Sequence, residues 1–101
     1  MHLVQLLLPL YNGKAEAFPS TLYEQVKKEL SQQFGGLTAY TGSPASGIWK
    51  DGEKIVKDDI YVYEIMLQEI DKNYWATYKS KLQLIFEQEE LIIRVSDITL
   101  L

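Results

Sequence analysis

The stretch IYVYEIML, residues 60–67, decides the fold, because a strand with one face in water would not be apolar on both sides. Successive side chains of a strand point to opposite faces of its sheet. One face of this stretch carries Tyr61, Tyr63, Ile65 and Leu67, and the other carries Ile60, Val62, Glu64 and Met66. We therefore predict a strand at residues 60–67 inside a sheet whose two faces are both largely covered.

Four further elements are predicted on either side of this strand. The apolar run at residues 3–10 stops before the turn residues 12–13, as is typical of a buried strand. Apolar residues at helical spacing predict helices over residues 22–34 and 72–86. Thr21 and Glu24 have the spacing of a capping box, Gly35 suits the exit from the first helix, and Asp71 suits the N-cap of the second. A last strand is predicted at residues 91–95, with residues 98–101 as a possible extension.

The segment between the first helix and residue 60 predicts a short strand at 37–41, an irregular stretch at 42–47 and then a hairpin. The hairpin has arms at residues 48–50 and 53–56. Asp51 and Gly52 form a pair that favours a type I′ turn. Asp58 and Asp59 then predict a bulge or bend.

The order strand, helix, strand, strand, helix, strand predicts a single α+β domain over residues 1–101. In this order, and in the position of its apolar stripes, the chain resembles the ferredoxin-like α+β superfamily over essentially its full length. The resemblance implies a βαββαβ antiparallel sheet with two helices on one face, here with an added β-hairpin. Dimeric α+β barrel proteins are among the relatives it implies, but a shared fold does not define an activity.

The charged residues predict which face of the sheet is open. An unpaired Glu64 carboxylate under two helices would cost several kcal/mol, so Glu64 is expected on the face without helices. Arg94, the only arginine, and Gln5 are expected on the same face. The candidate ligand-binding residues are Tyr40, Trp49, Glu64 and Arg94. For Glu64 and Arg94, the alternative to a ligand pocket is a structural salt bridge between them, or an Arg94 side chain that extends to the rim. For Trp49, the alternative to lining a site is that it caps the core.

The apolar residues left on the open face predict a partner chain. Leu3, Leu7, Ile60, Val62 and Met66 lie there, and 101 residues offer no further element to cover them. We expect a homodimer formed through the open sheet face, with trimers built on edge strands as the alternative.

Composition excludes several function classes. The chain has no cysteine, so it holds no disulfide and no thiolate nucleophile, and its net charge of −4 disfavours nucleic acid as a partner. No stretch approaches the ~20 apolar residues that span a bilayer, so no membrane is expected. No basic residue precedes the first apolar run, which favours a cytoplasmic location over a secretory signal.

The remaining chemistry is sparse. His2, the only histidine, is expected to be an ordinary surface residue, and neither a metal nor a cofactor is expected. The sequence thus predicts a small-ligand-binding or protein-interaction module without an assigned catalytic residue. The alternative is a cofactor-free enzyme of the dimeric α+β barrel type, acting on a small aromatic or polyketide-like substrate with Glu64 or a tyrosine as the acid–base group.

Overall fold

The computed structural model describes the backbone of residues 1–101 and all side chains except those of Ser43, Asp51, Val56 and Lys57. The elements in chain order are β1 (His2–Pro9), α1 (Ser20–Phe34), β2 (Thr38–Asp51), β3 (Lys54–Leu67), α2 (Lys72–Ile85) and β4 (Ile93–Asp97). The strands form one antiparallel sheet in the order β2-β3-β1-β4. The predicted α+β class is confirmed.

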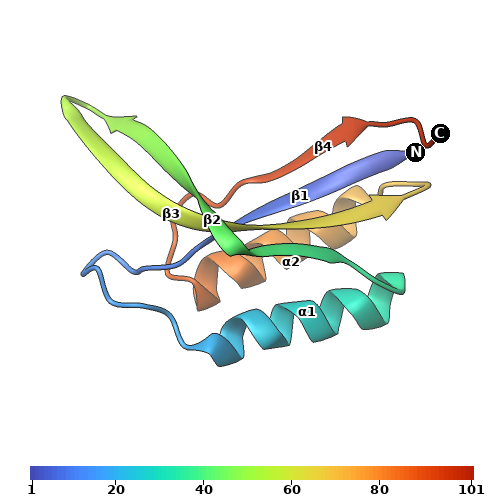
Figure 1. The fold of residues 1–101 in the computed structure, drawn as a ribbon, viewed down its shortest axis with the longest axis horizontal. Helices are drawn as coiled ribbons and strands as arrows, with labels where there is room; N and C mark the ends of the chain where they lie inside the picture. Colours follow the sequence, from blue (N-terminus) through green and yellow to red (C-terminus); the bar gives the residue numbers. More distant parts are fainter.

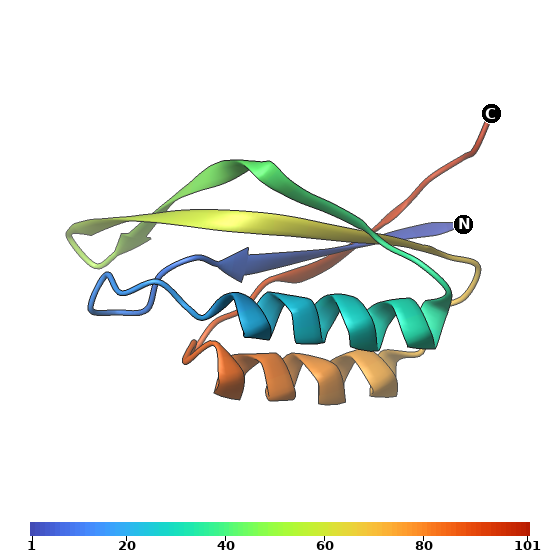
Figure 2. The ribbon, with the colours of Figure 1, turned by 60° about the horizontal axis from the view of Figure 1, so that its bottom comes forward.

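The sheet is curled, and both helices lie along the same face of it (Figure 1, Figure 2). In Figure 2, α1 and α2 run side by side beneath the strands, while the hairpin of β2 and β3 projects beyond the ends of the helices. No helix of the described chain is long and apolar enough to cross a membrane.

The core lies between the sheet and the helices because the strands alternate as their sequences require. In β1, Val4, Leu6 and Leu8 are fully buried. Their cross-strand partners in β3 are Ile65, Tyr63 and Tyr61, so the predicted placement of the two tyrosines under the helices is confirmed. The helices contribute six buried side chains, Tyr23, Val26, Leu30, Trp75, Tyr78 and Leu82, and Phe86 and Leu91 after α2 complete the core.

The predicted helix ends are partly wrong. Pro19 is the N-cap of α1 and no side chain caps this end, so the capping box of Thr21 and Glu24 does not form. Gly35 ends the helix with a φ of 85°, the left-handed conformation expected of it. The Asp71 cap of α2 is confirmed, since its carboxylate accepts hydrogen bonds from the backbone N–H groups of Asn73 and Tyr74 at 3.0 and 3.1 Å.

The hairpin differs most from expectation. Residues 42–47 belong to β2 rather than to an irregular linker, and no separate hairpin is added, because β2 and β3 themselves continue to the turn. The register shift lies between Tyr40 and Ala45, whereas Asp58 and Asp59 pair regularly. Pro44 falls within this shift, and a proline has no N–H to donate to a strand ladder.

The hairpin turn and the end of the last strand also differ from the prediction. Because Asp51 pairs with Lys54, the turn centres on Gly52 and Glu53, and of these two only Gly52 has positive φ, at 63°. A type I′ turn at Asp51-Gly52 is therefore wrong. At the other end of the chain, β4 stops at Asp97 and residues 98–101 do not extend it.

Candidate ligand-binding site on the open sheet face

A row of polar side chains crosses the face of the sheet that carries no helix. Gln5 of β1 is the cross-strand partner of both Glu64 in β3 and Arg94 in β4. The Arg94 Nε donates to Gln5 Oε1 at 2.8 Å, and Gln5 Nε2 donates to Glu64 Oε1 at 2.7 Å. The Tyr40 hydroxyl of β2 donates to Glu64 Oε2 at 3.1 Å. Each of the four strands thus contributes one member of this polar row, defined as Tyr40, Glu64, Gln5 and Arg94.

The polar row brings together three of the four predicted site residues. The expected shared face of Glu64, Gln5 and Arg94 is confirmed by the register and by these bonds. The direct Glu64–Arg94 salt bridge is not found among the described side chains, because Gln5 stands between the two charges and bonds to each. Each charge is therefore held by a neutral neighbour.

Both oxygens of Glu64 accept hydrogen bonds, and neither donor carries a charge. The bond to Glu64 and the charge of its carboxylate raise the pKa of Tyr40 above its ordinary value, because they favour the neutral phenol. The row consequently presents a negative carboxylate in the middle of the sheet and a positive guanidinium at the β4 edge.

Apolar side chains lie on either side of the polar row. On one side Leu3 pairs with Met66, and on the other Leu7 pairs with Val62. Met66 is 55% exposed, whereas Leu7 is only 9% exposed. We expected that no element of the chain covers the open face. This is confirmed around Met66, but the part near the hairpin, around Leu7, is buried by the chain itself.

Trp49 lies at that buried end, in a cavity of about 840 Å³ that it lines together with Leu7, Pro9 and Ile60. The opposite wall is formed by residues 88–92, which connect α2 to β4. The indole ring lies against Gly47, where an added Cβ would approach it to 3.1 Å. Any side chain at residue 47 would push the ring, so the glycine permits this position of Trp49.

Trp49 is not a member of the polar row. Tyr40, Glu64 and Arg94 do not line the hairpin cavity. The two features meet at the rung of Leu7 and Val62, because Leu7 lines the cavity and Val62 is the cross-strand partner of Tyr40; the rung of Gln5 and Glu64 is about 6.7 Å further along the sheet. The structure thus gives two adjoining features, a polar row and an apolar cavity.

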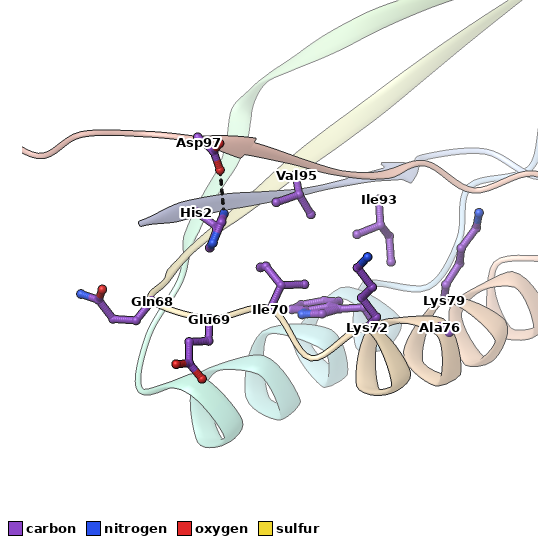
Figure 3. A pocket seen from close by; sticks show the side chains of 11 residues that line it. His2, Gln68, Glu69, Ile70, Lys72, Ala76, Lys79, Ile93, Val95 and Asp97 are labelled. Carbon is purple, nitrogen blue, oxygen red and sulfur yellow. Dashed lines mark ion pairs between the residues drawn. The ribbon is translucent and has the colours of Figure 1, made fainter.

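A second cavity, of about 650 Å³, lies at the β4 edge on the helix side, and sequence reasoning missed it (Figure 3). Trp75, Ile93 and Val95 give it an apolar lining, and Lys72 and Lys79 lie at its rim. His2 also lines it and forms an ion pair with Asp97, with 2.8 Å between Nδ1 and Oδ1. The prediction that His2 is an ordinary surface residue omitted its ion pair with Asp97. The pairing of the first and last strands, which places the two residues opposite each other, was the signal that could have revealed this partner.

Metal binding finds no support in the described side chains, which contain no cluster of three or more histidine, cysteine or carboxylate groups. The chemistry that the open face can supply is that of a carboxylate, a phenol and a guanidinium beside apolar surface. These groups suit hydrogen bonding to a small organic molecule.

Comparisons with known proteins give a fold but no family. No protein-family model and no curated protein matches the chain. Among solved structures it is similar to a phage SAM lyase in complex with S-methyl-5′-thioadenosine, with a TM-score of 0.61 and 12% identity over 95% of this chain and 80% of that one. For the apo state of a phage SAM lyase, the TM-score is 0.64 with 14% identity over 94% and 78% of the two chains. At these identities the likeness shows the fold alone.

Proposed function

We propose that this protein binds a small molecule on the open face of its sheet, with the polar row as the recognition element. The observation that carries the proposal is the unbroken hydrogen-bonded row from Tyr40 through Glu64 and Gln5 to Arg94, with apolar side chains of β1 and β3 on either side of it. Small-molecule sites combine apolar lining with a few polar groups in fixed positions. Here the bonds within the row fix the side chains before any ligand arrives, which lowers the entropic cost of binding.

The charges of the row suggest a zwitterionic ligand. Glu64 has no cationic partner among the described side chains, so its carboxylate attracts a positive group. Arg94 lies two strands away, about 10 Å between backbones, and attracts a negative group. A molecule with separated opposite charges and an apolar or aromatic body matches the row and the adjoining hairpin cavity.

S-Adenosylmethionine has this chemistry, with a sulfonium cation, a carboxylate and a nucleoside. The likeness in fold to the phage SAM lyases favours it as the first compound to test. It also favours a second candidate function, a cofactor-free lyase that breaks the bond between the sulfonium sulfur and the amino-acid chain of S-adenosylmethionine; the sulfur keeps the electron pair and leaves as S-methyl-5′-thioadenosine, while the substrate's carboxylate closes on the freed carbon to form a lactone. In that case Glu64 and Tyr40 are the groups expected to touch the substrate. A small aromatic or polyketide-like substrate has no comparable support.

Calorimetric titration with S-adenosylmethionine and with S-methyl-5′-thioadenosine tests the binding proposal. We expect Glu64→Gln to weaken binding of S-adenosylmethionine by about 10- to 100-fold, because a charged hydrogen-bonded group contributes about 1.5–3 kcal/mol. Glu53→Gln, at the exposed hairpin turn, is the matched control and should bind like the unmodified protein.

Two results would contradict the proposal: no binding of either compound at millimolar concentration, or equal loss of binding in both variants. Chromatography of the same mixtures separates the two candidate functions, since only a lyase forms S-methyl-5′-thioadenosine faster than a solution of S-adenosylmethionine without protein. Binding without product supports the module, and product that disappears in Glu64→Gln supports the enzyme.

The assembly remains part of this proposal. We propose that a second copy covers the part of the open face that the hairpin leaves exposed, around Leu3 and Met66; the exposure of Met66 supports this. We also propose that the fold is ferredoxin-like, which the strand order β2-β3-β1-β4 supports. A cytoplasmic location stays a prediction. Light scattering on Met66→Lys tests the face interface, because a lysine there should reduce the assembled mass if a second copy covers it.

A further inference from the structure

The outer edge of β4 carries backbone groups without a partner in the chain. β4 is the last strand of the sheet on its side. Leu7 N donates to Ile92 O, and Ile98 N donates to Met1 O. Counting every second residue between 92 and 98, Arg94 and Ser96 of β4 therefore turn their N–H and C=O groups toward β1. In an antiparallel ladder the alternate residues turn these groups the other way. The N–H and C=O groups of Ile93, Val95 and Asp97 therefore face outward.

The two edges of the sheet differ in how they are protected. The β2 edge contains Pro44 and a register shift between Tyr40 and Ala45, two devices that prevent a further strand from pairing. β4 has neither, because it contains no proline and its register with β1 is regular. At its centre Val95 is 47% exposed. The β4 edge is thus open to a further strand, and the β2 edge is not.

The surroundings of β4 indicate the charge of that strand. Lys72 and Lys79 of α2 line the cavity at the β4 edge; in Figure 3 the Lys72 side chain rises toward Ile93, and the Lys79 side chain rises on the other side of Ile93. Neither lysine forms an ion pair among the described side chains. A strand that pairs with β4 and places a carboxylate on the helix side opposite Ile93 would find both ammonium groups nearby.

We propose that β4 pairs antiparallel with β4 of a second copy, about a two-fold axis at Val95. This register places Ile93 opposite the partner's Asp97 and Arg94 opposite the partner's Ser96. It brings the partner's Asp97 to the helix side of the sheet, beside Lys72 and Lys79. One short strand therefore supplies both the hydrogen-bonding edge and a further carboxylate for Lys72 and Lys79, beyond Glu69 and Asp97 that already line the cavity.

Charge disfavours two of the alternative registers, and an axis at Ser96, which charge permits, would leave Ile93 and Arg94 without partners inside β4. Outward groups must meet outward groups, so the two-fold axis can shift only by whole residues along β4. An axis at Arg94 would set two arginines opposite each other, and one at Asp97 would set two carboxylates opposite each other, and facing like charges are destabilising. The axis at Val95 avoids both and pairs all residues of the strand.

This interface goes beyond the proposed ligand site and is separate from the face-to-face contact. It would join two sheets into one, so that the open face of one copy continues into that of the other at Arg94. If both two-fold interfaces form, they close into a tetramer only where the two axes cross at right angles.

Single cysteines test the register directly, because the chain contains no cysteine and any disulfide must join two copies. Two Val95→Cys residues would have Cα atoms about 5.5 Å apart, within the roughly 4.4–6.8 Å that a disulfide spans. Two Ile93→Cys residues would be offset by about 13 Å along the strands and out of reach. We expect Val95→Cys to give at least fivefold more cross-linked dimer than Ile93→Cys under mild oxidation, measured by non-reducing electrophoresis.

Val95→Pro provides an independent measurement. It removes an N–H that faces outward and leaves the ladder with β1 intact, so circular dichroism should show a folded chain while light scattering shows a smaller assembly. Equal cross-linking at the two cysteine positions, or an unchanged assembly in a folded Val95→Pro variant, would overturn the proposal. The face interface and the ligand site fail separately, since Met66→Lys and the titrations report on them without involving Val95.

Discussion

The two faces of the sheet are built from the same strands and differ in almost every physical property. The helix face is closed: Val4, Leu6 and Tyr63 have no exposed surface, and both helices pack on them. The open face, one residue further along each strand, carries the hydrogen-bonded polar row and the half-exposed Met66. Because side chains alternate with a period of two, one set of strands provides stability on one side and binding groups on the other.

Tyrosines report the same difference. On the helix face, burial raises the pKa of Tyr23 to about 12, with a smaller contribution from Tyr61. On the open face, the pKa of half-exposed Tyr40 is raised by its hydrogen bond to Glu64 and by the charge of that carboxylate. Both pKa values are raised, but that of Tyr23 is raised by burial and that of Tyr40 by its contact with Glu64. Different substitutions should therefore abolish the two shifts.

The largest expected effect comes from adjacent residues of β3 that point to opposite faces. Ile65 is 2% exposed on the helix face and Met66 is 55% exposed on the open face. We expect Ile65→Ala to lower the free energy of unfolding by about 2–5 kcal/mol, because it leaves a cavity in a packed core. Met66→Ala should cost less than about 1 kcal/mol.

Urea denaturation followed by circular dichroism measures both values on one protein. The variants should be compared below the concentration at which the chain assembles, since a covered Met66 would then be partly buried. Equal costs at the two positions would show that the open face is as closed as the helix face.

A smaller effect is expected from high pH, and it belongs to the helix face. Above pH 10.0, the ordinary pKa of a tyrosine, the unfolded chain releases the proton of Tyr23, while the folded chain keeps it until about pH 12. The unfolded state therefore binds fewer protons in this range, and the free energy of unfolding falls as pH rises. Burial also raises the pKa of Tyr63 and Tyr78, which adds to the fall.

Denaturation midpoints measured between pH 9 and pH 12 test this expectation. Tyr23→Phe loses the 2.6 Å hydrogen bond to the carbonyl of Pro9, so at neutral pH it should be less stable by about 0.5–1.5 kcal/mol. Above pH 10 its stability should fall less steeply than that of the unmodified chain. A midpoint that does not move with pH would mean that the buried phenols ionise as easily as free ones.

Sequence reasoning reached the open face because a single charged residue decides it. Glu64 cannot lie unpaired under the helices. Once its face is known, the alternation of side chains along a strand assigns a face to each of the remaining residues from 60 to 67. The positions of Arg94 and Gln5 followed from the same alternation in their own strands. What made this part predictable is that strand geometry is local and regular.

The features that were missed depend on contacts between distant residues or on backbone irregularity. Asp58 and Asp59 suggested a bend by composition, but they pair regularly with Gly47 and Ser46; the shift occurs further along β2, between Tyr40 and Ala45, where Pro44 has no N–H to donate. The cavity at the β4 edge joins His2, α2 and β4, which no local pattern connects. Trp49 could be placed in the hairpin but not against Leu7, because the curl of the sheet brings them together.

The smallest effect would separate the causes of the two tyrosine shifts. In Glu64→Gln the carboxylate that accepts the hydrogen bond of Tyr40, and whose charge opposes a phenolate, is gone, so the pKa of Tyr40 should move toward its ordinary value. The pKa of Tyr23 should stay near 12, because its burial under α1 is unchanged. Ring signals of labelled tyrosines, followed by NMR from pH 8 to pH 12, resolve the two groups. If both pKa values fell together, substitution on the open face would have loosened the helix face, and the two sides of the sheet would not be independent.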